Sequence, residues 1–168
     1  MAMQDIYIYI GAVHIAAAML HCGSTHLPCH WNLLILCNLG ETIESKNSPC
    51  NLLLDSLHAR EPHLLKRQLQ SYVDNILKYE EKEEIDEVMM YPFEIPRVPQ
   101  QNDGSKCGHY VLHYIYKFLM TCPDYYNYEE DYPGFMNESW FTADEVNEFS
   151  ANLPSWHETM LKKKRREE

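Results

Sequence analysis

The chain has 168 residues and a mass of 19.8 kDa, which is the size of one domain. Its hydrophobic content of 45% and charged content of 23% are ordinary for globular proteins, so disordered and fibrous classes are excluded. The formal net charge of -11 argues against direct nucleic-acid binding, which relies on clustered Lys and Arg, and favours a partner with a basic face.

The N-terminal segment Ile6–Leu20 is apolar but shorter than the roughly 18 to 20 residues that a membrane span needs. Asp5 stands where a signal peptide would carry positive charge, and His14 interrupts the apolar run. We therefore expect a strand at Ile6–Ile10 and a short helix in the Ala-rich stretch after it, rather than a signal or an anchor.

Two short apolar runs follow, Trp31–Leu39 and Asn51–Leu57, on either side of the polar segment Gly40–Pro49. This pattern predicts a hairpin of largely buried strands. From Pro62 onward, apolar residues recur at three- and four-residue spacing, which predicts a helix with proline in its first turn.

The acidic run Glu80–Glu87 is typical of a solvated helix end or loop, with an interaction surface as the alternative. Met89–Val98 is short, apolar and punctuated by proline, which favours an edge strand. The stripe between Val111 and Leu119 predicts a core helix that begins near Cys107 and ends at Cys122.

The C-terminal part begins with an aromatic and acidic stretch, Tyr125–Tyr132, which we expect to be a loop. Thr142 and Glu145 have the spacing of a capping box and predict a final helix. The basic run at 162–166 is either a nuclear-import signal or the solvated end of that helix. With no internal repeat or linker, residues 1–168 are expected to form a single domain.

Six cysteines are irregularly spaced in a chain too large to need a disulfide framework, so we expect reduced thiols and a nuclear or cytoplasmic location. A cluster at His21, Cys22, His26, Cys29 and His30 contains zinc-ligand residue types. Its spacing lacks a second finger-like pair, so no metal is predicted.

Cys107 is the candidate nucleophile. A cysteine attacks as thiolate, and a free thiol with a pKa near 8.5 needs a positive environment to form one. The expected helix start supplies positive partial charge, and the neighbours Ser105, Lys106 and Gly108 are not core-like. The alternative is that Cys107 is a small buried hydrophobe.

His30 is the candidate base because it directly precedes the strand that starts at Trp31. If that strand pairs antiparallel with the next one, in a register that sets residue 30 opposite residue 55, then His30 and Asp55 are neighbours. The carboxylate would fix the imidazole tautomer and stabilise the imidazolium. The alternative role of Asp55 is to cap the turn with Ser56.

The segment Pro99–Gly108 contains two glutamines, Gln100 and Gln101, followed by an Asn-Asp-Gly turn. A glutamine amide folded back by that turn is a candidate donor to a developing oxyanion, together with a backbone N–H at the helix start. The alternative is that both glutamines only shape the loop.

These motifs, with His30-Trp31 and Leu54-Asp55-Ser56-Leu57 in the same order, resemble the ubiquitin-like-protein-specific proteases, the SUMO-deconjugating cysteine peptidases, over about residues 26–150. The resemblance implies an α+β, papain-like fold in which a small mixed sheet packs against helices. It also implies His30 as base, Asp55 as orienting carboxylate, Gln101 as oxyanion donor and Cys107 as nucleophile, with Trp31 packed beside the site to contact substrate.

By this resemblance the chain cleaves after the C-terminal Gly-Gly of a ubiquitin-like modifier, SUMO first and NEDD8 or ubiquitin second, through a thioester. It would act as a monomer without cofactor, metal, nucleic acid or membrane. Three features depart from the family pattern: an atypical segment at residues 1–25 that looks like an N-terminal truncation, Lys106 where an acidic residue is usual, and a longer His30–Asp55 spacing. An inactive module that binds the modifier is the alternative function.

Overall fold

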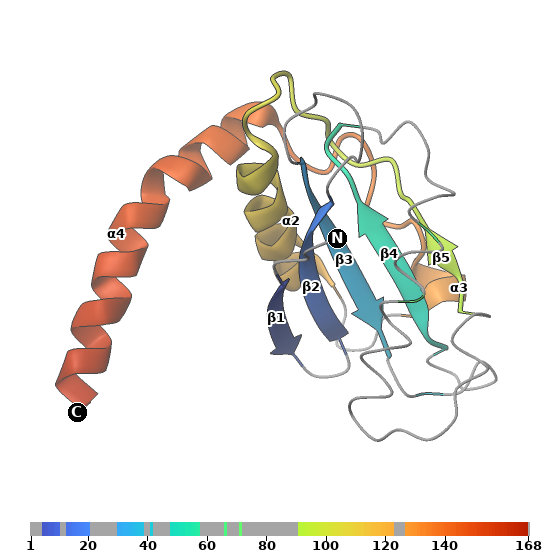
Figure 1. Cartoon of the computed structure of the whole chain (residues 1–168), viewed down its shortest axis with the longest axis horizontal. Coiled ribbons are helices and arrows are strands. Elements are labelled where there is room, and N and C mark those ends of the chain that lie inside the picture. Colours follow the sequence, from blue (N-terminus) through green and yellow to red (C-terminus); the bar gives the residue numbers. More distant parts are fainter. Residues whose placement is uncertain are drawn as a thin grey trace.

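The computed structural model describes residues 5–10, 13–20, 30–38, 41, 48–57, 66, 71, 91–122 and 127–167. Its elements, labelled as in Figure 1, are the strands β1 (Asp5–Ile10), β2 (Val13–Leu20), β3 (His30–Cys37), β4 (Cys50–Leu54) and β5 (Phe93–Glu94), and the helices α2 (Cys107–Thr121), α3 (Tyr128–Asp131) and α4 (Ala143–Glu167). The described chain is therefore an α+β domain, as the sequence predicts.

The five strands form one sheet in the order β1-β2-β3-β4-β5. The first three pairings are antiparallel and the last, between β4 and β5, is parallel, so the sheet is mixed. The expected hairpin is confirmed as β3 and β4, and the expected edge strand is confirmed in the shorter form of β5. The central strands β3 and β4 are buried along nearly their whole length, which explains their continuous apolar sequence.

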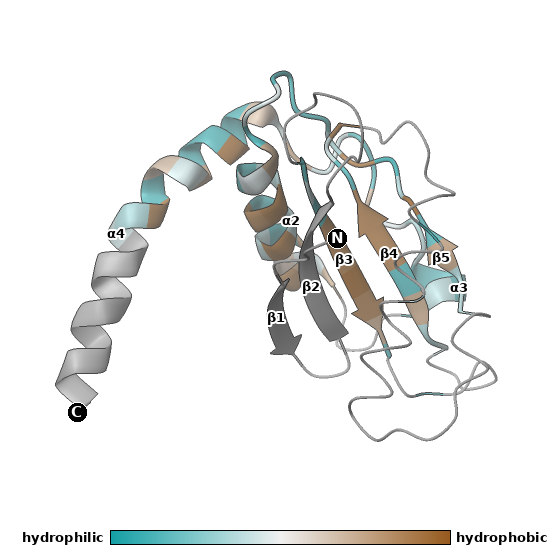
Figure 2. Ribbon diagram, in the orientation of Figure 1, coloured by the Kyte–Doolittle hydropathy of each residue, from teal (hydrophilic) through white to brown (hydrophobic). Residues whose placement is uncertain are grey.

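The core lies between α2 and one face of the sheet (Figure 1). Alternate residues of β3 and β4, among them Leu33, Ile35 and Leu52, are fully buried against Tyr114 and Phe118 of α2. In Figure 2 the brown, apolar residues of α2 and the brown strands β3 and β4 belong to this layer. The helix predicted from the Val111–Leu119 stripe is confirmed, and it begins at the nucleophile candidate. The stripe is core only in part, because Leu112 and Leu119 are exposed.

Helix α4 begins with the predicted capping box. The Thr142 hydroxyl accepts from the Glu145 N–H at 3.2 Å, and the Glu145 carboxylate accepts from the Thr142 N–H at 2.8 Å. The N-terminal part of α4 adjoins α2, and the rest extends away from the sheet (Figure 1).

Two predictions of local structure are wrong. The Ala-rich stretch is not a helix but strand β2, which is paired on both sides, with β1 and with β3. Pairing of this kind outweighs the helix preference of alanine, which is small per residue. Within the expected loop Tyr125–Tyr132 lies the short helix α3, whose first N–H groups are capped by the side chain of Asn127.

Other predictions fall mostly outside the described residues. Of the helix expected after Pro62, only Lys66 and Ser71 are described, and both are helical. The acidic run Glu80–Glu87 lies outside the described residues altogether. Among the helices that are described, none is both long and apolar enough to cross a membrane.

Candidate active site

The predicted site residues meet at one end of the sheet. His30 is the first residue of β3 and Asp55 directly follows β4, and because these strands are antiparallel the two positions lie at the same end. The start of α2 lies at this end too, since a β-carbon built on Gly108 would be 4.0 Å from Cδ1 of Trp31. Residues from three distant parts of the sequence are thereby brought together.

His30 and Asp55 are hydrogen-bonded. Nε2 of His30 lies 2.7 Å from Oδ1 of Asp55, and their side chains are 13% and 2% exposed. The same carboxylate oxygen accepts the backbone N–H of Leu57 at 2.9 Å. Because the carboxylate accepts, Nε2 carries a hydrogen and Nδ1 is the nitrogen left with a lone pair.

The predicted neighbourhood of His30 and Asp55 is confirmed, but the predicted register is wrong. Leu33 pairs with Leu54, so continuing the register sets residue 32, not residue 30, opposite residue 55. The error is two residues, and side chains alternate between faces with a period of two. His30 and Asp55 are therefore diagonal neighbours, and the imidazole bridges the offset.

Cys107 is the first residue of α2, and its residue is 7% exposed. Lys106, which precedes it, makes no side-chain cap, and the first turn of α2 contains no acidic residue. The N–H groups of that turn lack intrahelical partners and carry the positive end of the helix dipole. The sulfur thus lies where negative charge is favoured.

The other described cysteines offer poorer nucleophiles. Cys37 and Cys50 lie opposite each other on β3 and β4 as free thiols, and each is 1% exposed. A hydrogen bond with Cys50, together with burial, raises the pKa of Cys37. Burial also raises the pKa of Cys122 to about 11. Thiolate chemistry in this part of the chain therefore favours Cys107.

The two glutamines differ in how their amides are used. Nε2 of Gln100 donates to the carbonyls of Asp55 at 2.9 Å and Val98 at 2.8 Å, so both of its hydrogens are committed. Nε2 of Gln101 donates to the Asp103 carbonyl, and among the described residues its second hydrogen has no acceptor. Gln101 is 7% exposed and is the better placed of the two to serve an oxyanion.

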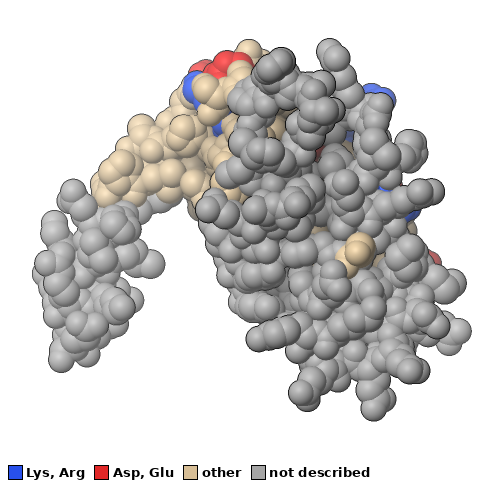
Figure 3. Space-filling view, viewed as in Figure 1, with Lys and Arg blue, Asp and Glu red and all other residues tan. Residues whose placement is uncertain are grey.

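The turn before Cys107 is organised by Asp103. Its carboxylate accepts the N–H and the hydroxyl of Ser105, both at 2.8 Å, and these bonds lower the pKa of Asp103. Lys106 Nζ lies 3.7 Å from the other carboxylate oxygen and donates to Asn147 of α4 at 3.0 Å. Acidic and basic side chains accordingly gather where this turn meets the start of α4 (Figure 3).

Three supporting residues were not assigned such roles from sequence. Ser56, 1% exposed, donates from its hydroxyl to Oε1 of Gln101 at 2.6 Å. The hydroxyls of Tyr110 and Tyr114 donate to the carbonyls of Gln100 and Pro99 and so hold the loop against α2. The four-residue spacing of the two tyrosines was an available signal, because it puts both on one face of a helix.

A metal centre finds no support in the part of the chain that the structure covers, where no three His, Cys, Asp or Glu side chains are grouped to hold an ion. Of the candidate zinc cluster only His30 is described, and it is engaged by Asp55. The remaining members, at 21–29, lie outside the described residues.

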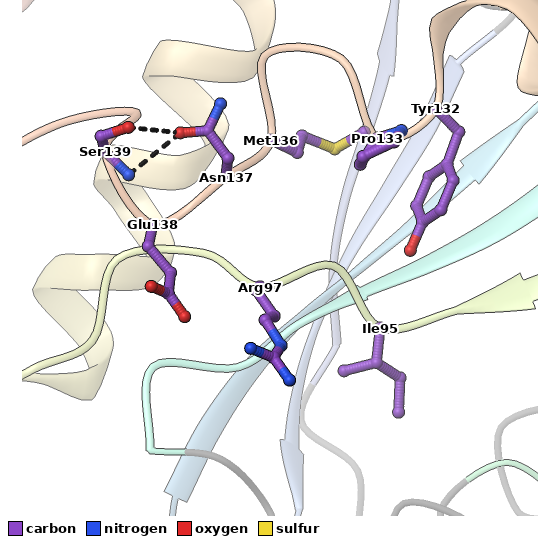
Figure 4. Close-up of a pocket in the computed structure, with 8 residues that line it drawn as sticks. All are labelled: Ile95, Arg97, Tyr132, Pro133, Met136, Asn137, Glu138 and Ser139. Atoms are coloured by element: carbon purple, nitrogen blue, oxygen red, sulfur yellow. Dashed lines mark hydrogen bonds between the residues drawn. The ribbon is translucent and has the colours of Figure 1, made fainter.

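A separate pocket of about 620 Å³ lies between the segment after β5 and the loop after α3 (Figure 4). It is lined by Ile95, Arg97, Tyr132, Pro133, Met136, Asn137, Glu138 and Ser139. Arg97 belongs to the segment after β5 and Glu138 to the loop after α3. None of the predicted site residues lines this pocket.

A thiol at the head of a helix and an imidazole held by a carboxylate are the parts with which cysteine peptidases work. Residues 14–148 match the sequence model of the Ulp1 protease family, C-terminal catalytic domain, and the chain belongs to this family of cysteine peptidases. The match begins at residue 14, within β2. It therefore starts nearer the N-terminus than the region of about residues 26–150 over which the motifs resemble the family.

Two curated relatives come from Arabidopsis thaliana. The chain is 30% identical over 132 residues to a probable ubiquitin-like-specific protease 2B and 27% identical over 128 residues to a probable ubiquitin-like-specific protease 2A. Each alignment covers 70% of this chain, and only 14% and 16%, respectively, of the two relatives. The chain thus corresponds to a small part of each.

Proposed function

We propose that this chain cleaves the peptide or isopeptide bond after the C-terminal Gly-Gly of a ubiquitin-like modifier, with SUMO as first choice and NEDD8 or ubiquitin as the next. The observation that carries the proposal is the 2.7 Å bond between His30 Nε2 and Asp55, at the sheet end where α2 begins with Cys107. Family membership and the names of the two relatives support the substrate class.

The proposed first step begins when Nδ1 of His30 takes the proton of the Cys107 thiol. The thiolate then attacks the glycine carbonyl carbon, and the carbonyl electron pair moves to oxygen. The second Nε2 hydrogen of Gln101 and a backbone N–H at the start of α2 stabilise this oxyanion. When the oxyanion collapses, the C–N bond breaks and the leaving amine takes the proton from the imidazolium.

The thioester that results is hydrolysed by the same residues. Nδ1 of His30 takes a proton from water, the hydroxide attacks the thioester carbonyl, and the C–S bond breaks to release the modifier as a carboxylic acid, which gives its proton to solvent. The thiolate that leaves recovers the proton from His30. Asp55 stays ionised and holds the imidazole orientation throughout. Trp31, half-buried next to Gly108, is the proposed substrate contact beside the sulfur.

The proposal is tested by treating the purified chain with modifiers that carry a C-terminal vinyl sulfone, one each for SUMO, NEDD8 and ubiquitin. We expect one probe to label Cys107, and the matching modifier with a short extension after Gly-Gly to be cut. Cys107→Ser should abolish both, while Cys122→Ser, at a half-buried thiol of raised pKa, should leave both unchanged. Cleavage that survives Cys107→Ser would refute the mechanism, and binding of a modifier without labelling or cleavage would support an inactive binding module.

The proposed location is the nucleus or cytoplasm, where the cysteines would stay reduced. A fluorescent fusion with the run at 162–166 intact, or with its five basic residues replaced by Gln, tests whether that run directs nuclear import.

A further inference from the structure

Ser56 links the segment that contains Asp55 to the loop that contains Gln101. Its hydroxyl donates to Oε1 of Gln101 at 2.6 Å, and its own backbone carbonyl accepts the Gln101 N–H at 2.9 Å. Both residues are buried, at 1% and 7% exposure, so water does not compete for these bonds. Residues 45 apart in the sequence are thus linked at two points.

The hydroxyl bond fixes which end of the Gln101 amide is turned toward Ser56 and which end is turned toward the loop before Cys107. The two ends of a carboxamide are nearly the same size but opposite in function, since NH₂ donates and the carbonyl oxygen only accepts. Ser56 has one O–H hydrogen, and using it on Oε1 commits that oxygen to the Asp55-Ser56 segment. Nε2 is then directed to the side of the loop that leads to Cys107, where it also donates to the Asp103 carbonyl.

We propose that Ser56 is a positioning residue for catalysis, which keeps the donor end of Gln101 toward the developing oxyanion. The inference rests on the proposed function and deepens it. Without the hydroxyl, the amide is free to turn over and present Oε1, and an acceptor in that place repels the oxyanion instead of stabilising it. Ser56 also directly follows Asp55, so a single strand end orients both the base and the oxyanion donor.

The test is a double-mutant cycle measured with the modifier precursor that the chain cuts. Ser56→Ala should lower kcat by roughly 10-fold or more, bounded by the roughly 10² to 10³ expected for loss of the donor itself, with KM nearly unchanged. In a Gln101→Ala background the same change should lower kcat by less than about 2-fold, because no amide remains to be oriented. Ser150→Ala, which removes a half-buried hydroxyl on α4, is the matched control and should leave kcat unchanged.

A second measurement separates positioning from general damage to the site. Alkylation of Cys107 by iodoacetamide forms no oxyanion, so the dependence of its rate on pH should be the same in Ser56→Ala and in the wild-type chain. A parallel fall of alkylation and kcat, or a loss of kcat that persists in the Gln101→Ala background, overturns the proposal. Ser56→Thr, which keeps the hydroxyl, should recover part of the activity if its methyl group is accommodated, and the cycle decides the matter in either case.

The orientation of the amide is also measurable without catalysis. In ¹⁵N spectra the side-chain NH₂ pair of Gln101, assigned by its disappearance in Gln101→Ala, should shift and exchange faster with solvent in Ser56→Ala. If the wild-type chain cleaves no modifier but the Gln101 signals do shift in Ser56→Ala, the proposed function fails while the contact between Ser56 and Gln101 stands. If cleavage occurs and neither kcat nor this pair responds to Ser56→Ala, the positioning role is refuted and the proposed function remains.

Discussion

Replacing each of the two adjacent glutamines by alanine separates a catalytic amide from a structural one. Gln100 gives both amide hydrogens to carbonyls, at 2.9 and 2.8 Å, and a typical net value of about 0.5 to 1.5 kcal/mol per bond predicts a stability loss of about 1 to 3 kcal/mol for Gln100→Ala. For a chain of this size that corresponds to a fall in Tm of roughly 2 to 12 °C. Its kcat, measured well below Tm, should change little.

Gln101→Ala removes bonds to Ser56 and Asp103, so its Tm should fall by a similar amount. Its kcat should fall by roughly 10² to 10³, about 2.7 to 4 kcal/mol of transition-state stabilisation, with little change in KM. Melting temperature alone therefore does not separate the two variants, and the ratio of their kcat values does. The assay is steady-state cleavage of a modifier precursor at a temperature where both variants are folded. Equal losses of kcat in the two variants would refute the oxyanion role.

Three further predictions concern stability. Phe118→Ala, at a fully buried core position, should cost about 3 to 5 kcal/mol in urea unfolding. Thr142→Ala should cost about 0.5 to 2 kcal/mol by removing the cap of α4, and Thr142→Ser should restore most of it. Burial between aromatic rings holds the pKa of His113 below its usual 6.5, with Glu145 opposing and Lys117 adding to the shift. As the pH falls, the His113 imidazole is protonated in the unfolded chain before it is protonated in the folded one. The stability it contributes is therefore full above about pH 6.5 and is lost as the pH falls through that value toward the lower folded pKa. His113→Phe should make Tm depend less on pH in this range.

The neighbourhood of His30 and Asp55 was easier to predict than the register of the two strands that position them. The contact between His30 and Asp55 survived a register error because the error was even: a shift of two residues leaves every side chain on its own face, whereas a shift of one would have separated them. The strands carry Leu and Ile on both faces, so their sequence contains no alternation that would fix the register. The contact between the residues at the two strand ends was therefore better specified by the sequence than the pairing along the strands.

The Ala-rich strand β2 and the buried His113 illustrate what sequence patterns leave out. The helix preference of alanine is small per residue, and the strand conformation of β2 depends on pairing with β1 on one side and β3 on the other, which the composition of the Ala-rich stretch does not contain. His113 lies on the apolar stripe of α2, and within the described residues neither ring nitrogen has a hydrogen-bond partner. Its environment is created by Phe141 and Phe149, which belong to a later segment, so no local pattern reveals it.

Lys106 directly precedes the candidate nucleophile Cys107, and its contacts explain how the site accommodates a cation there. A cation next to a thiol would change the local field if it stood alone, but Nζ lies 3.7 Å from the Asp103 carboxylate and both side chains are about 40% exposed, where solvent screens what remains. The ammonium donates to Asn147 at 3.0 Å, so its stem points from the loop toward α4. The nearby Asp103 carboxylate offsets the charge of Lys106 beside Cys107. Through its bond to Asn147, the lysine links the turn that contains Asp103 to helix α4. Since the carbonyl of Asp103 also receives the Gln101 amide, α4 is connected through this turn to the proposed oxyanion donor.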